Sequence, residues 1–431
     1  MARSDNKNLV YGEWWRGQSG LGKLDQNKFY DLDNCDIHSE VGLVQPQLAL
    51  ISDSNTPSEA CFSAIVPTGD VYLCSKTTGK IWKRAVSDGT YSLVHTNTNT
   101  AHRGCRYFNG YLFYWVSNKL GYYDLSSTWS DSFATFTNSN ARGAEEHANC
   151  LYILDGRYAA RIDAANAFSA NELSLPAQFI GTAIKSLGDD LLIGTYIGTN
   201  VSYCKVFLWD SVNTSWTLES EIFEIGVNCF IQLDGLLLAQ CGTEGRFYYW
   251  SGLRMKKFGK IRGITTALGE QMSCVYKGRA LFANANKCYS IHREDKDLEW
   301  AFCKEYTVTT GTIASLLVQA DQLLVHRGTG VDKVGTSRAI ATIETPEMPR
   351  QFNNSIVLYE DNPSGITIST KINNGVYATK TPILDTIHRT VSFDGGEKEC
   401  VYGQAKITLT PYSEGSPAVE KVPKIRLISL L

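Results

Sequence analysis

The densest group of side chains that could do acid–base chemistry is Glu145, Glu146 and His147, three consecutive residues in the first half of the chain. A carboxylate beside an imidazole can act as an acid–base couple near neutral pH. The three residues directly precede an apolar run, so a solvated loop is the interpretation that we favour. His102 and His326 stand apart from this group, and each is followed by an arginine.

A glycine-rich segment from Gly17 to Lys23 matches most of a phosphate-binding loop. In such loops the residue after the lysine is a Ser or Thr whose hydroxyl binds Mg²⁺. Leu24 stands at that position, and the preceding residues, YGEWWR, do not read as a buried strand. The sequence therefore predicts no nucleotide site, and it contains no Gly-x-Ser-x-Gly motif either.

The twelve cysteines are spread singly along the chain, and no two of them form a Cys-x-x-Cys pair. Zinc sites and redox motifs usually need such closely spaced pairs. Several cysteines lie in strand-like runs, such as Cys74 in VYLCS and Cys204 in SYCKVF. We therefore expect free, buried thiols that act as small apolar side chains, with no metal and no cofactor.

Most of the residues named above lie within or beside a repeated pattern. A turn-like pair followed by an apolar run occurs seven times in the chain. The third residues of the copies, the anchors, are Val71, Leu112, Leu151, Leu191, Leu237, Ala280 and Leu323. Their intervals of 39 to 46 residues match the length of a β-propeller blade. Asn109-Gly110 and Asp234-Gly235 precede two of the runs and are typical of tight hairpin turns.

These repeats predict an all-β protein built around a seven-bladed β-propeller over residues 60–345. Residues 1–59 are polar and predict an extended N-terminal arm. Residues 346–431 lose the repeat phase and contain short alternating strands, which predict a small C-terminal β-sandwich. A chance recurrence of hairpins in another all-β fold is the alternative interpretation.

Charge and hydropathy exclude several classes of partner. The formal net charge is −3 without a basic stripe, so we expect no specific nucleic-acid site. The start of the chain, MARSDNKNLVYGEWW, has no apolar core of signal-peptide length, and no apolar run is long enough for a membrane segment. We therefore expect synthesis in a cytosol. Trp14 and Trp15 in the polar arm are candidate contacts to a neighbouring subunit, or they pack on their own propeller.

Two end segments resemble parts of known proteins. FYDLDNCDIHSEVGLVQPQLALI (29–51) resembles the entry segment of propeller-bearing structural proteins of tailed phages, and KITLTPYSEGSPAVEKVPKIRLISLL (406–431) resembles the closing hairpin of the β-sandwich that often follows such propellers. The resemblance implies a non-enzymatic virion protein of the phage tail (a nozzle, hub or tail-surface component), synthesised in the host cytoplasm. Its partners would be other virion subunits and further copies of itself in a symmetric oligomer.

Two other functions stay open at this point. A carbohydrate-binding or glycan-cleaving propeller is one, although a glycosidase needs two carboxyl groups about 5–10 Å apart. We find no carboxylates repeated at equivalent positions of the blades. A cytosolic protein-interaction scaffold is the other, and its sequence would look the same as that of a tail protein. The assembly state, rather than the sequence, distinguishes these functions.

Overall fold

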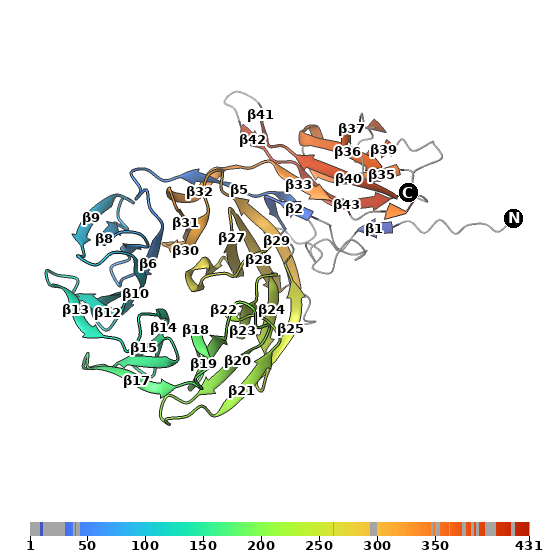
Figure 1. Cartoon of the computed structure of the whole chain (residues 1–431). Coiled ribbons are helices and arrows are strands. Elements are labelled where there is room, and N and C mark those ends of the chain that lie inside the picture. The colour runs from blue at the N-terminus through green and yellow to red at the C-terminus, as the bar shows by residue number, and fades with distance from the viewer. Residues whose placement is uncertain are drawn as a thin grey trace. The chain divides into compact units, whose positions relative to one another are not determined.

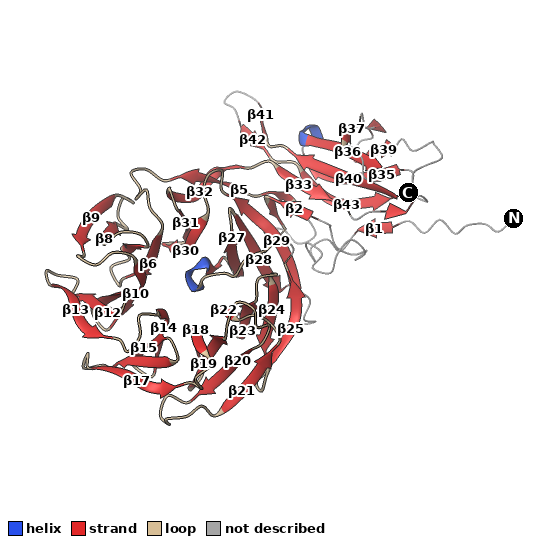
Figure 2. Ribbon diagram, in the orientation of Figure 1, coloured by secondary structure: helices blue, strands red, loops and turns tan. Residues whose placement is uncertain are grey.

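A computed structural model describes residues 9–11, 31–37, 39, 44–261, 263–293, 300–345, 348–349, 354–361, 363–372, 376–380, 383–384, 388–392, 402–414 and 419–430. Strands dominate these residues (Figure 2), and none of their helices is long and apolar enough to cross a bilayer. The chain divides into two compact units. The larger unit comprises Ser52–Asn286 and Val308–Lys333, and the smaller comprises the described residues of Met1–Ile51, Lys287–Thr307 and Val334–Leu431.

Six separate four-stranded sheets are present in the described part of the chain. Five follow one another in sequence: β6 (Cys61–Ile65), β7 (Val71–Ser75), β8 (Lys80–Arg84) and β9 (Tyr91–Thr96); β10 (His102–Phe108), β11 (Tyr111–Val116), β12 (Lys119–Tyr123) and β13 (Trp129–Thr135); β14 (Ala141–His147), β15 (Cys150–Asp155), β16 (Tyr158–Ile162) and β17 (Phe168–Ser174); β18 (Ile180–Leu187), β19 (Asp190–Tyr196), β20 (Cys204–Trp209) and β21 (Leu218–Ile222); β22 (Val227–Leu233), β23 (Leu236–Cys241), β24 (Arg246–Trp250) and β25 (Met255–Lys260). The sixth has the order β30 (Ile313–Gln319), β31 (Gln322–Arg327), β32 (Gly330–Arg338) and β5 (Leu48–Ser52). In Figure 1 successive sheets follow one another around a centre, which is the arrangement of a β-propeller.

The first strands of the sheets form a closed circle. A further hairpin, β26 (Ser273–Tyr276) and β27 (Arg279–Asn284), belongs to a larger sheet. β6 lies beside β10, and the order continues through β14, β18, β22, β26 and β30 back to β6. The seven predicted anchors all lie in the second strand of a hairpin, and every one of them is buried. The predicted repeat is thus confirmed at the level of its hairpins, while the number of blades stays a prediction.

The turn-like pair of the repeat has a conformational reason. Asn109 and Gly110 have φ angles of 45° and 87°, and Asp234 and Gly235 have φ angles of 48° and 76°. Positive φ at both central residues gives a two-residue turn whose twist matches that of the paired strands. Asn, Asp and Gly adopt this conformation with the least strain, so the turns predicted at these pairs are confirmed.

A buried ionic network, which we call the ring-closing network, links the last sheet of the circle to the first. Asp53 Oδ2 accepts hydrogen bonds from Arg84 Nε at 3.2 Å and Nη2 at 3.1 Å, and from the Tyr91 hydroxyl at 3.0 Å. Its Oδ1 accepts a hydrogen bond from Lys333 Nζ at 2.8 Å. The guanidinium of Arg84 also donates to Gln319 Oε1. Burial by itself raises the pKa of the Asp53 carboxyl, but these cations and donors outweigh it and hold the pKa below its usual range.

The smaller unit holds two groups of strands. One is a five-stranded sheet in the order β1 (Leu9–Tyr11), β43 (Lys424–Leu430), β35 (Asn354–Asp361), β39 (His388–Ser392) and β38 (Ile383–Leu384). The other runs in the order β28 (Lys287–Arg293), β29 (Trp300–Thr307), β2 (Asp31–Asp33), β33 (Ala341–Glu344), β40 (Tyr402–Leu409), β36 (Ile366–Ile372) and β37 (Ala378–Thr379), with β34 (Met348–Pro349) beside β40. The remaining described elements are the hairpins β3 (Cys35–Asp36) with β4 (Gln45–Pro46) and β41 (Tyr412–Glu414) with β42 (Val419–Lys421), and the short helix η3 (Pro363–Gly365).

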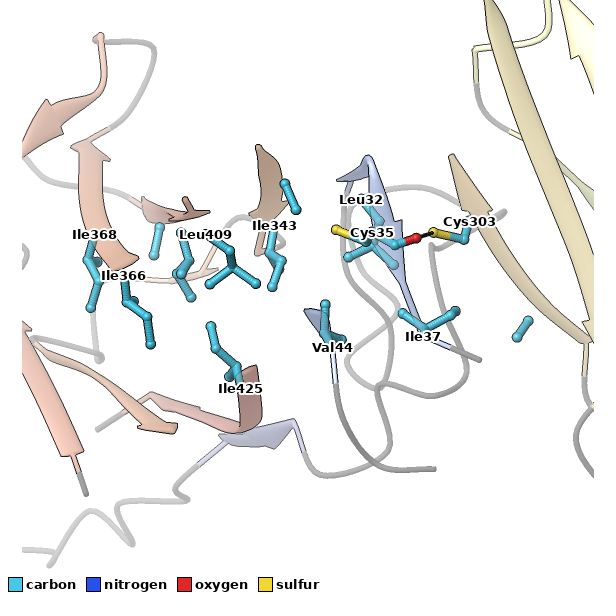
Figure 3. Packing of buried hydrophobic residues seen from close by; sticks show 14 residues of the cluster. Leu32, Cys35, Ile37, Val44, Cys303, Ile343, Ile366, Ile368, Leu409 and Ile425 are labelled. Carbon is cyan, nitrogen blue, oxygen red and sulfur yellow. Dashed lines mark hydrogen bonds between the residues drawn. The ribbon is translucent and has the colours of Figure 1, made fainter. Parts of the chain in front are cut away.

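One apolar cluster joins the two ends of the chain within the smaller unit (Figure 3). Leu32, Cys35 and Val44 from the N-terminal part are buried together with Ile366 and Leu409 from the C-terminal part. The described residues of the predicted arm thus contribute apolar side chains to this core. The compact units accordingly follow boundaries other than the predicted ones at 59/60 and 345/346.

Candidate functional site

A central cavity of about 730 Å³ lies within the larger unit. Its wall is formed by the first strands β6, β10, β14, β18, β22, β26 and β30, by Lys76 after β7, and by residues at the short helix η2 (Glu270–Met272). Figure 2 shows η2 pointing toward the centre of the circle of sheets. Gln271 of this helix accepts a hydrogen bond from the backbone N–H of Ser63 at 2.8 Å, so η2 is tied to β6.

The pairing register places equivalent residues of neighbouring strands around the cavity. Because a two-residue turn joins each first strand to its second strand from β10 onward, positions can be matched by their distance from the anchor. Six residues before the anchors lie Arg106, Glu145, Lys185, Ile231, Cys274 and Leu317, which we call the Glu145 layer. Nine residues before the anchors, the cavity is lined by Arg103, Arg142, Thr182, Asn228 and Gln271, which we call the Arg142 layer.

Glu145 holds two cations in its layer. Its Oε1 lies 2.5 Å from Lys185 Nζ, and its Oε2 lies 3.3 Å from Arg106 Nη2. The three side chains come from β14 and from the strands on either side of it, β18 and β10. Because both carboxylate oxygens bind a cation, the role of Glu145 is to fix these side chains and to neutralise one of their two charges.

The Arg142 layer carries positive charge with little compensation. Arg103 and Arg142 are both exposed, and both line the cavity. Lys76, which also lines it, donates a hydrogen bond from Nζ to the Ala314 carbonyl at 2.8 Å. The Lys76 ammonium also lies 4.2 Å from the centroid of the Phe62 ring. Burial lowers the pKa of Lys76 to about 8. Among the described residues, neither Lys76 nor Arg142 forms an ion pair with a carboxylate.

The chemical character of the wall differs between its two sides. Strands β10 and β14 with β18 supply four cationic side chains and Glu145, and Lys76 adds a fifth cation. Strands β26 and β30 supply mainly apolar side chains, among them Val275, Leu316 and Val318. The described part of the cavity is therefore both cationic and apolar, each on its own side.

Trp115 of β11 adds a polar group that lacks a partner. Its side chain is buried, it lines the cavity, and its indole Nε1 has no hydrogen-bond acceptor among the described residues. Gly104 on the neighbouring β10 makes room for the ring, because a Cβ there would lie 2.2 Å from Trp115 Cζ2. A buried N–H without an acceptor costs about 1–3 kcal/mol.

The predicted acid–base group lies in β14 rather than in a solvated loop. Glu145 binds the two cations described above, whereas His147 is buried with its Nδ1 2.8 Å from Ser186 Oγ. Glu146 is exposed. The loop interpretation is therefore wrong for Glu145 and His147, because both lie in β14 on its buried face, while the alternation of the strand turns Glu146 to the exposed face.

The two isolated histidines are structural. His102 is buried, with Nδ1 3.0 Å from the Ser75 carbonyl oxygen, and burial lowers its pKa. His326 is buried with Nδ1 3.1 Å from Ser315 Oγ, and burial lowers its pKa to about 3. Both imidazoles are therefore neutral near pH 7. His102 bonds to the neighbouring sheet, whereas His326 bonds to the paired strand of its own sheet.

Some of the predicted residues lie outside the described residues: Trp14, Trp15 and the segment from Gly17 to Lys23. No group of three or more metal-ligating side chains occurs where the structure describes the chain. Arg106, Arg142 and Lys185 were not singled out from the sequence. Their places six or nine residues before an anchor are a signal that could have found them.

Nine of the eleven described cysteines are buried. We predict that alkylation of the whole protein under denaturing, non-reducing conditions modifies all twelve thiols, as counted by intact mass. The reason is that a thiol reacts as its thiolate, which burial disfavours. Burial raises the pKa of the Cys204 thiol to about 12, which keeps this thiol unreactive in the folded protein. A shortfall of two modified thiols would reveal a disulfide.

No protein-family model and no curated protein matches the chain. Solved structures resemble it in fold. A streptogramin B lyase is 13% identical with a TM-score of 0.52, covering 67% of this chain and 97% of that chain. A catalytically inactive virginiamycin B lyase from Staphylococcus aureus with quinupristin is 12% identical (TM-score 0.54, 68% and 99% covered). A chain of the mitotic checkpoint complex is 12% identical (TM-score 0.51, 67% and 91% covered). At such identities the likeness shows the β-propeller fold alone.

Proposed function

We propose that the protein is a non-enzymatic virion structural protein of a phage tail, which assembles with other virion subunits and with copies of itself. The end segments 29–51 and 406–431 suggest this class of protein. The observation that favours assembly over glycan cleavage is the pairing of Glu145, the one carboxylate in the described cavity wall, with two cations. Both of its oxygens bind cations, whereas a glycosidase needs two carboxyl groups about 5–10 Å apart around the scissile bond.

The architecture in this proposal is a seven-bladed propeller followed by a β-sandwich. The place of β26 between β22 and β30 supports a seventh blade. The strand content of residues 273–307, two successive hairpins, supports it as well. Ile425 of the five-stranded sheet is buried in one cluster with Ile366 and Leu409 of the other group of strands, which supports two sheets packed face to face.

Assembly contacts are proposed on the smaller unit and on the N-terminal residues. Among the described strands, β1 and β38 lie at the two edges of the five-stranded sheet. An edge strand presents N–H and C=O groups that a strand of another chain can pair with. Trp14 and Trp15 come three and four residues after the end of β1 in the sequence and are the proposed aromatic anchors. The protein would be synthesised in the host cytoplasm and reside in the virion tail.

Mass photometry of the full-length protein, followed by negative-stain imaging, tests this proposal. A ring or another oligomer of fixed size is the expected result. A monomer at every concentration would favour the cytosolic scaffold instead. Hydrolysis of glycans at a rate abolished by one carboxylate substitution would replace the proposal with the enzyme alternative.

Substituting both Trp14 and Trp15 by alanine is expected to shift the mass distribution toward monomers while changing the melting temperature little. The reason is that aromatic anchors contribute mainly to association when they bind another subunit. Phe223→Ala is the matched control, because Phe223 is 71% exposed in the larger unit and should not affect assembly. Deleting residues 1–28 should also abolish assembly, but it removes β1 as well. An unchanged mass distribution of the double variant would contradict the proposed contact.

A further inference from the structure

We propose that the central cavity binds an amphipathic organic anion, with its carboxylate or phosphate group between Arg103 and Arg142 and its apolar body against β26 and β30. The inference goes beyond the proposed function and does not depend on it. It rests on two features of the cavity wall: its charge, and the division between a cationic and an apolar side.

Charge is the first feature. The whole chain carries a formal net charge of −3, yet the described wall of the cavity has five cationic side chains and one carboxylate. Like charges in a concave, partly desolvated space repel one another and raise the local concentration of anions. Glu145 compensates one charge of its own layer, which leaves the Arg142 layer as the place where a bound anion would be most favourable.

Arg103 and Arg142 are the side chains that we propose to bind the head group. They stand at equivalent positions of the adjacent strands β10 and β14. Arg103 has a neutral partner, Asn140 Oδ1 at 3.3 Å, and Arg142 has no carboxylate partner among the described residues. Guanidinium groups bind carboxylates and phosphates through pairs of parallel hydrogen bonds, so two neighbouring ones can hold the oxygens of a single head group.

The apolar side of the wall sets the rest of the ligand. Leu316 and Val318 of β30 and Val275 of β26 offer contact surface without hydrogen-bonding groups. The Trp115 indole in the same wall is buried, and its N–H has no acceptor among the described residues. The volume of about 730 Å³ falls within the range of roughly 300–1,000 Å³ that small-molecule sites occupy.

A pair of fluorescent probes separates the contribution of charge from that of apolar contact. 8-Anilinonaphthalene-1-sulfonate carries an anionic group on an apolar body, and N-phenyl-1-naphthylamine has the same body without the charge. Both are titrated into the full-length protein and its variants. We expect Arg103→Gln/Arg142→Gln to weaken binding of the anionic probe by at least about tenfold, because charge-assisted hydrogen bonds are lost. Binding of the neutral probe should change by less than about threefold.

Three controls make the result specific. Arg254→Gln removes an exposed arginine in the turn between β24 and β25 and should change neither affinity. Arg103→Lys/Arg142→Lys keeps the charges but loses the paired guanidinium hydrogen bonds, so its anionic affinity should lie between those of the wild type and the glutamine variant. This variant also reports on folding if the glutamine variant is unstable. Decanoate and decyl phosphate should displace the anionic probe, and the stronger competitor identifies the head group, whereas decanol should not compete.

Two outcomes would overturn the proposal. One is equal binding of the anionic probe by the Arg103→Gln/Arg142→Gln and Arg254→Gln variants. The other is an equal loss of both probes in the double variant, since this would assign the effect to a changed fold rather than to a lost anion site.

Discussion

Replacing Asp53 with alanine is expected to lower the free energy of unfolding by about 3–5 kcal/mol, the typical cost of breaking a buried ion pair. The side chains of Asp53 and Arg84 are only 3% and 7% exposed, so the variant would leave the Arg84 charge buried without its carboxylate. Lys333 and the Tyr91 hydroxyl would lose their acceptor as well. Urea unfolding followed by tryptophan fluorescence measures the change.

The control is the double variant Asp53→Leu/Arg84→Leu, which removes both charges together. A buried pair replaced by apolar side chains of similar volume costs far less than one broken pair, so this variant should be more stable than Asp53→Ala. If Asp53→Ala loses less than about 1 kcal/mol, the network does not close the ring and the expectation is wrong.

Acid titration gives a second readout of the same carboxyl. Its pKa is lower in the folded protein than in the unfolded chain, so it contributes stability above the unfolded pKa of about 3.9. This contribution is lost as the pH falls below that value and through the folded pKa. The stability difference between wild type and Asp53→Ala should therefore be full at pH 6 and shrink under acid conditions.

Replacing the anchor Leu191 with alanine is expected to lower the free energy of unfolding by about 2–5 kcal/mol. Leu191 is fully buried and packs in a cluster with Phe207 and Trp209, which are themselves buried and cannot easily collapse into the space. Val212→Ala is the matched control in the same sheet region, because Val212 is 84% exposed, and its effect should stay within about 0.5 kcal/mol. Equal effects of the two variants in urea unfolding would show that the anchors are not the core of the repeat.

The hairpins could be predicted from the sequence because their information is local. A turn pair such as Asp234-Gly235 and an apolar run of fixed length determine one hairpin, and the repeat multiplies this signal. The core of the smaller unit could not be predicted in the same way. Leu32 and Val44 are isolated apolar residues in a polar segment, and their partners Ile366 and Leu409 lie more than three hundred residues away.

The cavity wall shows where local reasoning stops. Glu145 and Lys185 are ordinary charged residues until the register of two strands is known, and then they become neighbours 2.5 Å apart. Lys76 reaches the wall from the end of a different strand, so no spacing rule includes it. The loop predicted at residues 145–147 was wrong because the three residues lie in β14, which buries Glu145 and His147 and turns Glu146 to the opposite face.

The way in which the circle closes has a consequence for how the chain is made. Ser52 Oγ donates a hydrogen bond to Asp332 Oδ1, and the two residues are 280 positions apart. During synthesis the surface of the first sheet that packs against the last sheet therefore stays uncovered until nearly the whole chain has left the ribosome. Such late, long-range closure slows folding and lengthens exposure to aggregation. We expect chaperones and translation speed to govern the yield of this protein more than its final stability does.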